Sequence, residues 1–255
     1  MFHALTWLHR RLSQSALAAG ELLFPPACAV CEETIEREVS DAPLFCATCR
    51  GELWSQVTFC PRCALPCPNL PNPTGDCPVC RTEKFAFDGA RTLGVYEFAL
   101  RQMILRIKHP AFEPLAIQLG KLLAERLRAE PFALPPTVVI PVPMHFLRRI
   151  WRGTSAADTM AQTVARELGL PCIADLIRCK RMLKKQASLP ATERRNNVRG
   201  AFGVGWGFDL REARVLIVDD VITTGSTCHS IAKELKQAGV PQVYVAAVAR
   251  ATTMN

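Results

Sequence analysis

The sequence lacks the features of secreted and membrane-spanning proteins. No stretch approaches the roughly 18 consecutive apolar residues that a bilayer-spanning helix needs. The segment from Met1 to Ala19 places His9, Arg10 and Arg11 where a secretory signal would carry an unbroken apolar run. We therefore expect a cytoplasmic protein without a membrane span, whose twelve cysteines are reduced.

Common phosphate-binding motifs and aromatic residues are also scarce. No Gly-x-x-x-x-Gly-Lys-Ser/Thr occurs, and no Gly-x-Gly-x-x-Gly opens a predicted helix. Aromatic residues make up 7% of the chain and few lie beside basic runs, whereas a dedicated single-strand binder interleaves aromatics for base stacking. What is present is a formal charge of +8, which attracts phosphate-rich partners, either nucleic acid or a polyphosphorylated small molecule.

Cysteine density and periodicity divide the 255 residues into regions. Nine of the twelve cysteines lie between Cys28 and Cys80, among many prolines. We predict a helical lead-in over residues 1–27, a zinc-binding module over 28–84 and an α/β domain over 85–255. In the last region we expect strands at 89–96, 137–140, 215–218 and 243–248, and helices at 98–108, 113–129, 155–168 and before Gly239. Strands that alternate with helices predict a mostly parallel sheet flanked by helices.

Eight cysteines form four Cys-x-x-Cys pairs, which are Cys28/Cys31, Cys46/Cys49, Cys60/Cys63 and Cys77/Cys80. Fourteen residues separate the first two pairs and thirteen the last two, close to zinc-ribbon spacing. Disulfides, an iron–sulfur cluster and a redox Cys-x-x-Cys are the alternatives, and two structural Zn²⁺ ions are the prediction. The spacing leaves open whether the pairs close in sequence order or interleave. Cys67 is interpreted as a spare thiol.

An acidic pair follows the apolar run Val215–Val218. Asp219 and Asp220 precede a loop of small and hydroxyl residues that opens onto a helix, namely Thr223, Thr224, Gly225, Ser226 and Thr227. A helix start presents free N–H groups and a positive dipole end, so a phosphate is expected in the loop. The carboxylates would accept hydrogen bonds from sugar hydroxyls or help to hold Mg²⁺. The plainer interpretation is an acidic strand end with a helix cap.

The stretch Val-Leu-Ile-Val-Asp-Asp-Val-Ile-Thr-Thr-Gly-Ser-Thr resembles the phosphoribosyl-pyrophosphate (PRPP) signature of type I phosphoribosyltransferases. Four further segments resemble ComF proteins, so that the resemblance runs from about Leu22 to Arg250; they are Leu23–Pro26, Ile107–His109, Pro141–His145 and Arg199–Phe202. It implies an α/β fold with a type I phosphoribosyltransferase-like, mostly parallel sheet behind a small zinc-ribbon module. It also implies an association with natural transformation.

The resemblance assigns roles to residues. Asp219 and Asp220 would contact the ribose hydroxyls, and residues 223–227 the 5′-phosphate. The pyrophosphate loop would hold Pro143, Met144 and His145, with Lys108, Arg148 and Arg149 as further anion contacts. A basic stretch corresponds to a mobile loop beside the site, although such a charge run is often just a solvated face; it includes Lys184, Lys185, Arg194 and Arg195.

Three functions follow from this resemblance. The first is transfer of phosphoribose from PRPP, with Mg²⁺, to an unidentified nitrogenous acceptor. The second is a non-catalytic competence factor that binds single-stranded DNA and other competence proteins, with PRPP as effector. The third is nucleotide salvage. One departure bears on catalysis, because residues 152–156 read Arg-Gly-Thr-Ser-Ala where the family usually has Arg-Gly-Phe-Asn-Gln, without its amide side chains.

Overall fold

The computed structural model describes residues 27–35, 44–54, 56–68, 77–144, 155–181, 197–205 and 207–252. The chain forms two compact units, Met1–Glu52 and Leu53–Asn255. The helix expected before Ala27 lies outside the described residues. Among the residues that are described, no helix combines the length and the apolar character needed to cross a membrane.

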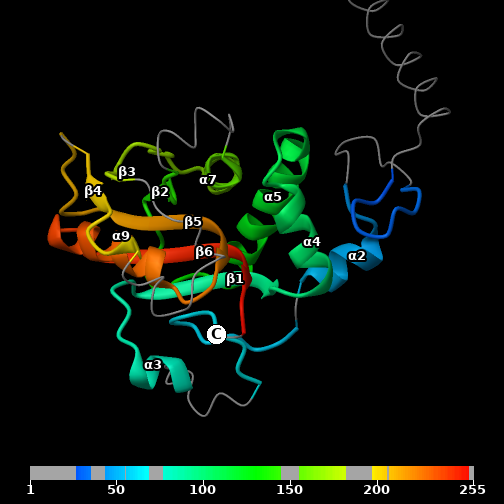
Figure 1. The fold of residues 1–255 in the computed structure, drawn as a ribbon, viewed down its shortest axis with the longest axis horizontal. Coiled ribbons are helices and arrows are strands. Elements are labelled where there is room, and N and C mark those ends of the chain that lie inside the picture. Colours follow the sequence, from blue (N-terminus) through cyan, green and yellow to red (C-terminus); the bar gives the residue numbers. More distant parts are fainter. Residues whose placement is uncertain are drawn as a thin grey trace, which may run out of the picture. The chain divides into compact units, whose positions relative to one another are not determined.

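The larger unit is built on a four-stranded parallel sheet with the order β1-β6-β5-β2 (Figure 1). The strands are β1 (Gly89–Val95), β2 (Val138–Pro141), β5 (Arg214–Ile222) and β6 (Gln242–Arg250). β6 is buried from Val243 to Arg250, and β5 is buried from Val215 to Val218 and again at Ile222. Such near-continuous apolar runs are typical of strands covered on both faces. The predicted mostly parallel sheet is confirmed.

Helices cover the sheet as the alternation predicts. They are α4 (Phe98–Arg106), α5 (Glu113–Ala129), α7 (Ala156–Leu168) and α9 (Ser226–Gln237), with a short 3₁₀ turn at Pro110–Phe112. α5 and α7 pack against each other, α5 also contacts β1 and β6, and α7 contacts β2 and β5. The two helices approach closely at Gly120, where an added Cβ would lie 2.9 Å from Cβ of Thr163.

The opposite face of the sheet packs against α9, a short antiparallel hairpin and the cysteines Cys60, Cys63 and Cys77. The hairpin joins β3 (Ile177–Cys179) to β4 (Phe202–Val204), and residues 56–85, here called the second ribbon, include the short helix α3 (Pro78–Thr82). Cys60 and Cys63 share one hydrophobic core with Val245 of β6 and Ile231 of α9. The second ribbon is therefore part of the core of the larger unit.

Residues 28–53, here called the first ribbon, contain the helix α2 (Ala47–Leu53), and nearly all of them belong to the smaller unit. Its buried centre consists of Cys28, Ile35 and Cys49. The division between compact units thus falls inside the stretch 28–84, between Glu52 and Leu53. The predicted boundary between the zinc-binding module and the α/β domain, at residues 84/85, stays a prediction.

Two details differ from the expectation. β5 does not end before the acidic pair but continues to Ile222, because β6 pairs with it as far as Ile222 and Arg250. The hairpin β3–β4 was not predicted, since strands of three residues are too short to show an alternating pattern.

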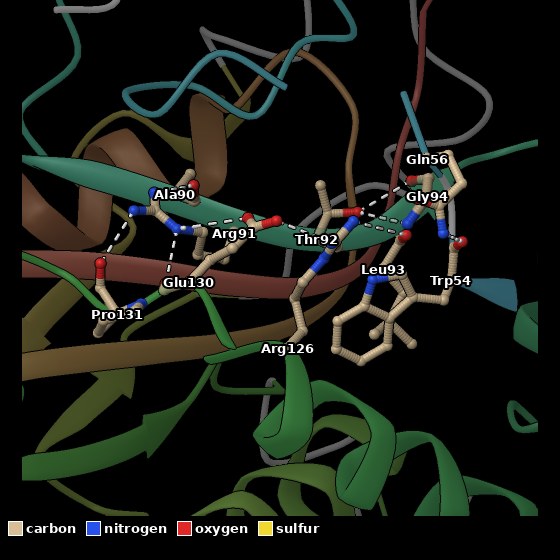
Figure 2. Close-up of polar contacts among 10 residues, drawn as sticks. All are labelled: Trp54, Gln56, Ala90, Arg91, Thr92, Leu93, Gly94, Arg126, Glu130 and Pro131. Carbon is tan, nitrogen blue, oxygen red and sulfur yellow. Dashed lines mark hydrogen bonds and ion pairs between the residues drawn. The ribbon is translucent and has the colours of Figure 1, made fainter. Parts of the chain in front are cut away.

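Two arginines tie β1 to the end of α5 (Figure 2). Arg126 is 4% exposed; its Nε donates to the Thr92 carbonyl at 3.0 Å, and its Nη1 pairs with Glu130 Oε1 at 2.8 Å. Arg91 donates from Nε to the Glu130 carbonyl at 2.9 Å and from Nη2 to the Pro131 carbonyl at 3.3 Å. Carbonyls at and just after the helix end, which lack intrahelical partners, are thereby satisfied.

Candidate functional site

The eight paired cysteines form two groups, one in each ribbon. Within each group the Sγ atoms all lie within 4.8 Å of one another; the groups are Cys28, Cys31, Cys46, Cys49 and Cys60, Cys63, Cys77, Cys80. Sγ–Sγ distances include 3.8 Å from Cys31 to Cys46 and 3.9 Å from Cys60 to Cys80. Four thiolates at tetrahedral Zn²⁺ stand about 3.8 Å apart, given Zn–S bonds of about 2.3 Å. The pairs close in sequence order, which spacing alone left open.

The surroundings of the sulfur atoms fit a cation. Backbone N–H groups point at the sulfurs, as Cys46 N does at Cys28 Sγ and Cys80 N at Cys77 Sγ, both at 3.4 Å. A hydrogen bond with the Cys60 sulfur, burial and the nearby Cys60 and Cys80 charges raise the pKa of Cys63 far above that of a free thiol. A cation held between the sulfurs would offset this cost of ionising a buried thiol. The donor sets fit two structural zinc ions.

Cys67 lies outside both groups, as the spare-thiol interpretation expected. It is buried, and burial raises its pKa to about 11, so it remains a protonated thiol at neutral pH.

The acidic pair lies near the carboxyl end of β5. Asp219 Oδ1 accepts a hydrogen bond from the backbone N–H of Asp220 at 2.8 Å. Asp220 Oδ2 lies 3.6 Å from Nζ of Lys108, which follows α4. Burial and the neighbouring Asp220 carboxylate raise the pKa of Asp219 well above its usual range. A site that raises the pKa of an acid in this way is suited to receive a cation or a hydroxyl donor.

The loop Thr223–Thr227, here called the phosphate loop after the role that the sequence predicts for it, includes the first two residues of α9. Gly225 has φ +77°, and a Cβ there would lie 2.9 Å from the Phe85 ring, so both its conformation and its space require glycine. The hydroxyls of Thr224 and Ser226 are buried and lie 2.7 Å apart, within hydrogen-bonding distance of each other. Thr223 and Thr227 are partly exposed, and the first turn of α9 presents backbone N–H groups.

The start of the predicted pyrophosphate loop lies beside the acidic pair. The Val142 N–H donates to the Val218 carbonyl at 2.9 Å and so continues the β2–β5 ladder past Pro141. Pro143 and Met144 follow and are partly buried. The remaining predicted basic contacts and the basic stretch lie outside the described residues, namely His145, Arg148, Arg149, Lys184, Lys185, Arg194 and Arg195.

The structure also brings together residues that the sequence did not single out for the site. A cavity of about 590 Å³ borders the phosphate loop at Thr224 and Ser226. Its other walls are residues 83–85 of the second ribbon, residues 198–200, and the side of α9 that carries His229 and Lys233. The Ala86 N–H donates to His229 Nδ1 at 3.1 Å. Only the Arg199–Phe202 segment pointed to this region, through its resemblance to ComF proteins.

The fold and the paired thiols define a class, a phosphoribosyltransferase-type α/β domain joined to a double zinc ribbon. The phosphoribosyl transferase domain family matches residues 113–253, and the double zinc ribbon domain family matches residues 19–81. The chain belongs to the ComF family. It is 30% identical over 214 residues to competence protein F of Haemophilus influenzae, covering 81% of this chain and 90% of that protein.

Other relatives agree with this family. DNA utilization protein YhgH of Escherichia coli K12 is 29% identical over 206 residues, covering 79% of this chain and 88% of that protein. Among solved structures, adenine phosphoribosyl transferase from Trypanosoma brucei aligns with a TM-score of 0.37 and 18% identity, over 61% of this chain and 69% of that one. A TM-score this low adds nothing to the family assignment, which rests on sequence.

We predict different effects when zinc is lost from the two ribbons. Cys31→Ser and Cys63→Ser should each remove one of two bound zinc ions, measured by metal analysis. Only Cys63→Ser should destabilise β5 and β6, by about 3 kcal/mol or more out of the roughly 10–16 kcal/mol of a structural zinc site. The reason is that Cys63 lies in the core of the larger unit. Native-state hydrogen exchange of the two strands is the measurement, and equal losses in both variants would contradict it.

A second prediction concerns the charge of Asp219. Its pKa is raised in the folded chain, so ionisation costs stability above the ordinary carboxyl pKa of about 4. Asp219→Asn keeps an oxygen to accept from Asp220 N and removes the charge. The variant should unfold at higher urea concentration than the wild type at pH 7, and the difference should vanish below about pH 4.

Asp209→Asn is the matched control for this measurement. Arg211 lowers the pKa of the exposed Asp209, so its replacement should leave stability unchanged or slightly reduced at pH 7. A gain of stability in both variants would show a general charge effect and contradict the local explanation.

Proposed function

We propose that this chain binds PRPP with Mg²⁺ at the carboxyl end of β5 and transfers its phosphoribosyl group to a nitrogenous acceptor, in the service of DNA uptake or use. The observation that carries the proposal is the meeting of an acidic pair, a lysine and a glycine turn at one edge of a parallel sheet. Asp220 and Lys108 lie 3.6 Å apart, and Gly225 opens α9 a few residues later. Ligands bind at this edge in open α/β sheets.

The proposed reaction makes demands that these groups can meet. The bond from C1 of the ribose to pyrophosphate breaks, and its electron pair leaves with pyrophosphate. The acceptor nitrogen bonds to C1 and releases its proton to water or to the departing pyrophosphate. Asp219 and Asp220 would hold the ribose hydroxyls, and their negative charge would stabilise the positive charge that develops on the sugar. Mg²⁺, if held there, would neutralise the negative charge that grows on the departing pyrophosphate. The phosphate loop would hold the 5′-phosphate, and Lys108 with Pro143, Met144, His145 and Arg148 would surround the pyrophosphate.

The link to DNA rests on relatives and on charge. The relatives are named competence protein F and DNA utilization protein, and this chain carries a formal charge of +8. A second candidate function, single-strand binding with PRPP as effector, is favoured by the missing amide side chains at residues 152–156. Its basic contacts would include Lys184, Lys185, Arg194 and Arg195. Three further predictions remain, namely action in the cytoplasm, contact with other competence proteins, and the third function, nucleotide salvage. Failure to complement salvage mutants would exclude the salvage function.

Calorimetry with PRPP and Mg²⁺ tests the proposed site. Replacing Asp219 and Asp220 together by Asn should weaken binding at least about a hundredfold, because two charged hydrogen-bond acceptors are lost. Zinc content should stay unchanged, and Asp209→Asn should bind like the wild type. Wild-type affinity in the double variant would refute the site. A folded wild type that binds no PRPP would point to a degenerate transferase scaffold and would leave single-strand binding without PRPP as its effector.

Salt dependence tests the DNA contacts. Alanine at Lys184, Lys185, Arg194 and Arg195 should lower the slope of log affinity against log salt by up to about 3, at about 0.7 per lost phosphate contact. A matched control removes equal charge from other exposed positions, namely Arg101, Arg166, Arg178 and Arg211. An unchanged slope in the first variant, or equal changes in both, would exclude a specific role for the basic stretch.

A further inference from the structure

The first knuckle of the second ribbon, residues 60–63, contacts elements that lead to the phosphate loop. The Pro61 carbonyl accepts from Ala90 N of β1 at 3.0 Å. Arg62 Nη2 donates to the Phe85 carbonyl at 3.0 Å, and the Cys63 carbonyl accepts from Arg250 Nε at 3.1 Å. Pro61, Arg62 and Cys63 all belong to the Cys60/Cys63 pair and its two intervening residues. Their hydrogen bonds therefore hold the metal-binding turn against the sheet and against the segment around Phe85.

Arg250 connects this knuckle to the loop directly. It is the last residue of β6 and is fully buried. Its Nε donates to Cys63, and its Nη1 donates to the Ile222 carbonyl at 2.9 Å and to the Ala251 carbonyl at 3.3 Å. Ile222 immediately precedes the phosphate loop. One planar guanidinium thus fixes the distance between the zinc-binding turn and the start of the loop.

Burial makes this arginine costly unless something compensates its charge. Its Nη2 has no hydrogen-bond partner among the described residues. Four thiolates around Zn²⁺ leave a net negative charge, and one of the four ligands, Cys63, is the residue whose carbonyl accepts from Arg250 Nε. The negative metal site therefore stabilises the positive charge of the buried guanidinium while the metal is bound. When the metal is lost, that positive charge is left uncompensated.

A second route joins the ribbon to the middle of the loop. The Phe85 ring lies against Gly225, leaving no space for a Cβ, and stacks on Phe87 with ring centroids 4.8 Å apart. The next residue, Ala86, donates its N–H to His229 in the second turn of α9. The phosphate loop is thus held before its first residue by Arg250 and at its glycine by Phe85.

We propose that Arg250 is a positioning residue that couples the second ribbon to the phosphate loop, so that zinc retention at Cys60, Cys63, Cys77 and Cys80 and PRPP binding strengthen each other. The inference rests on the proposed function, since it takes PRPP as the ligand of the loop. The inference applies to the second ribbon alone, because nearly all of the first ribbon belongs to the other compact unit. Coupling of this kind is reciprocal, so it can be measured from either site.

The first experiment measures PRPP affinity in full-length Arg250→Lys by calorimetry. A lysine keeps the charge but cannot donate to Cys63 and Ile222 in the same fixed geometry. We expect the PRPP Kd to rise about tenfold, within the usual range of coupling between sites. Arg126→Lys is the matched control, because Arg126 is also buried but donates to Thr92 and Leu93 (Figure 2). Wild-type affinity in Arg250→Lys, or equal losses in both variants, would overturn the inference.

The second experiment reads the same coupling from the metal. In a Cys31→Ser background only the second ribbon should keep its zinc, so loss of zinc to a chromogenic chelator reports on that site. PRPP should slow this loss about tenfold, and should not slow it when Arg250→Lys is added. Zinc loss that is indifferent to PRPP, in a protein that binds PRPP, would overturn the inference.

Hydrogen exchange separates failure of the inference from failure of the proposed function. Without any ligand, residues 222–227 should exchange faster in Arg250→Lys than in the wild type or in Arg126→Lys. If the wild type binds no PRPP, the proposed function fails, and this measurement alone decides whether the ribbon orders the loop. If Arg250→Lys does not fold, Phe85→Leu provides the same test from the contact at Gly225. Unchanged exchange of residues 222–227 in Phe85→Leu would then overturn the coupling.

Discussion

The parallel ladder that places β5 between β6 and β2 determines where the chemical groups of the candidate site lie. Register with β6 carries β5 through Asp219 and Asp220, and the ladder with β2 brings the start of the next loop beside them. Parallel strands end at the same edge of a sheet, so loops distant in sequence meet there. A slip of one residue would turn both carboxylates to the opposite faces, because side chains alternate along a strand.

The two ribbons share a ligand pattern but differ in what surrounds them. The first has a small buried centre of its own, Cys28 with Ile35 and Cys49. The second contributes Cys60, Cys63 and Cys77 to the same core as α9 and one face of the sheet. A small module with little apolar content relies on its metal for its own stability. When a module that packs against a sheet loses its metal, the packing of the sheet is disturbed as well. The two zinc sites therefore share the same four-cysteine ligand set, but loss of zinc from each should affect the larger unit differently.

Much of the fold was predictable because its signals are local. The apolar runs before Asp219 and after Gly239 indicated buried strands, and helix periodicity gave α5 with the same ends as the structure. The Cys-x-x-Cys pattern gave all eight candidate zinc ligands, but not their division between two sites. The end of β5 was misjudged, because pairing with β6 rather than local sequence decides how far a strand runs. The hairpin β3–β4 is too short to leave a periodic signal.

For the candidate site, the sequence by itself determined which residue types are available and in what order: the acidic pair, the glycine turn into α9 and eight thiols in pairs. These depend on neighbours a few positions apart, whose chemistry shows in the sequence. Only the tertiary structure decided that the cysteine pairs close in order, that Lys108 reaches Asp220, and that Arg250 joins Cys63 to Ile222. Contacts such as that between Arg250 and Cys63 join residues far apart in the chain, and they form only because packing of the sheet brings those residues together.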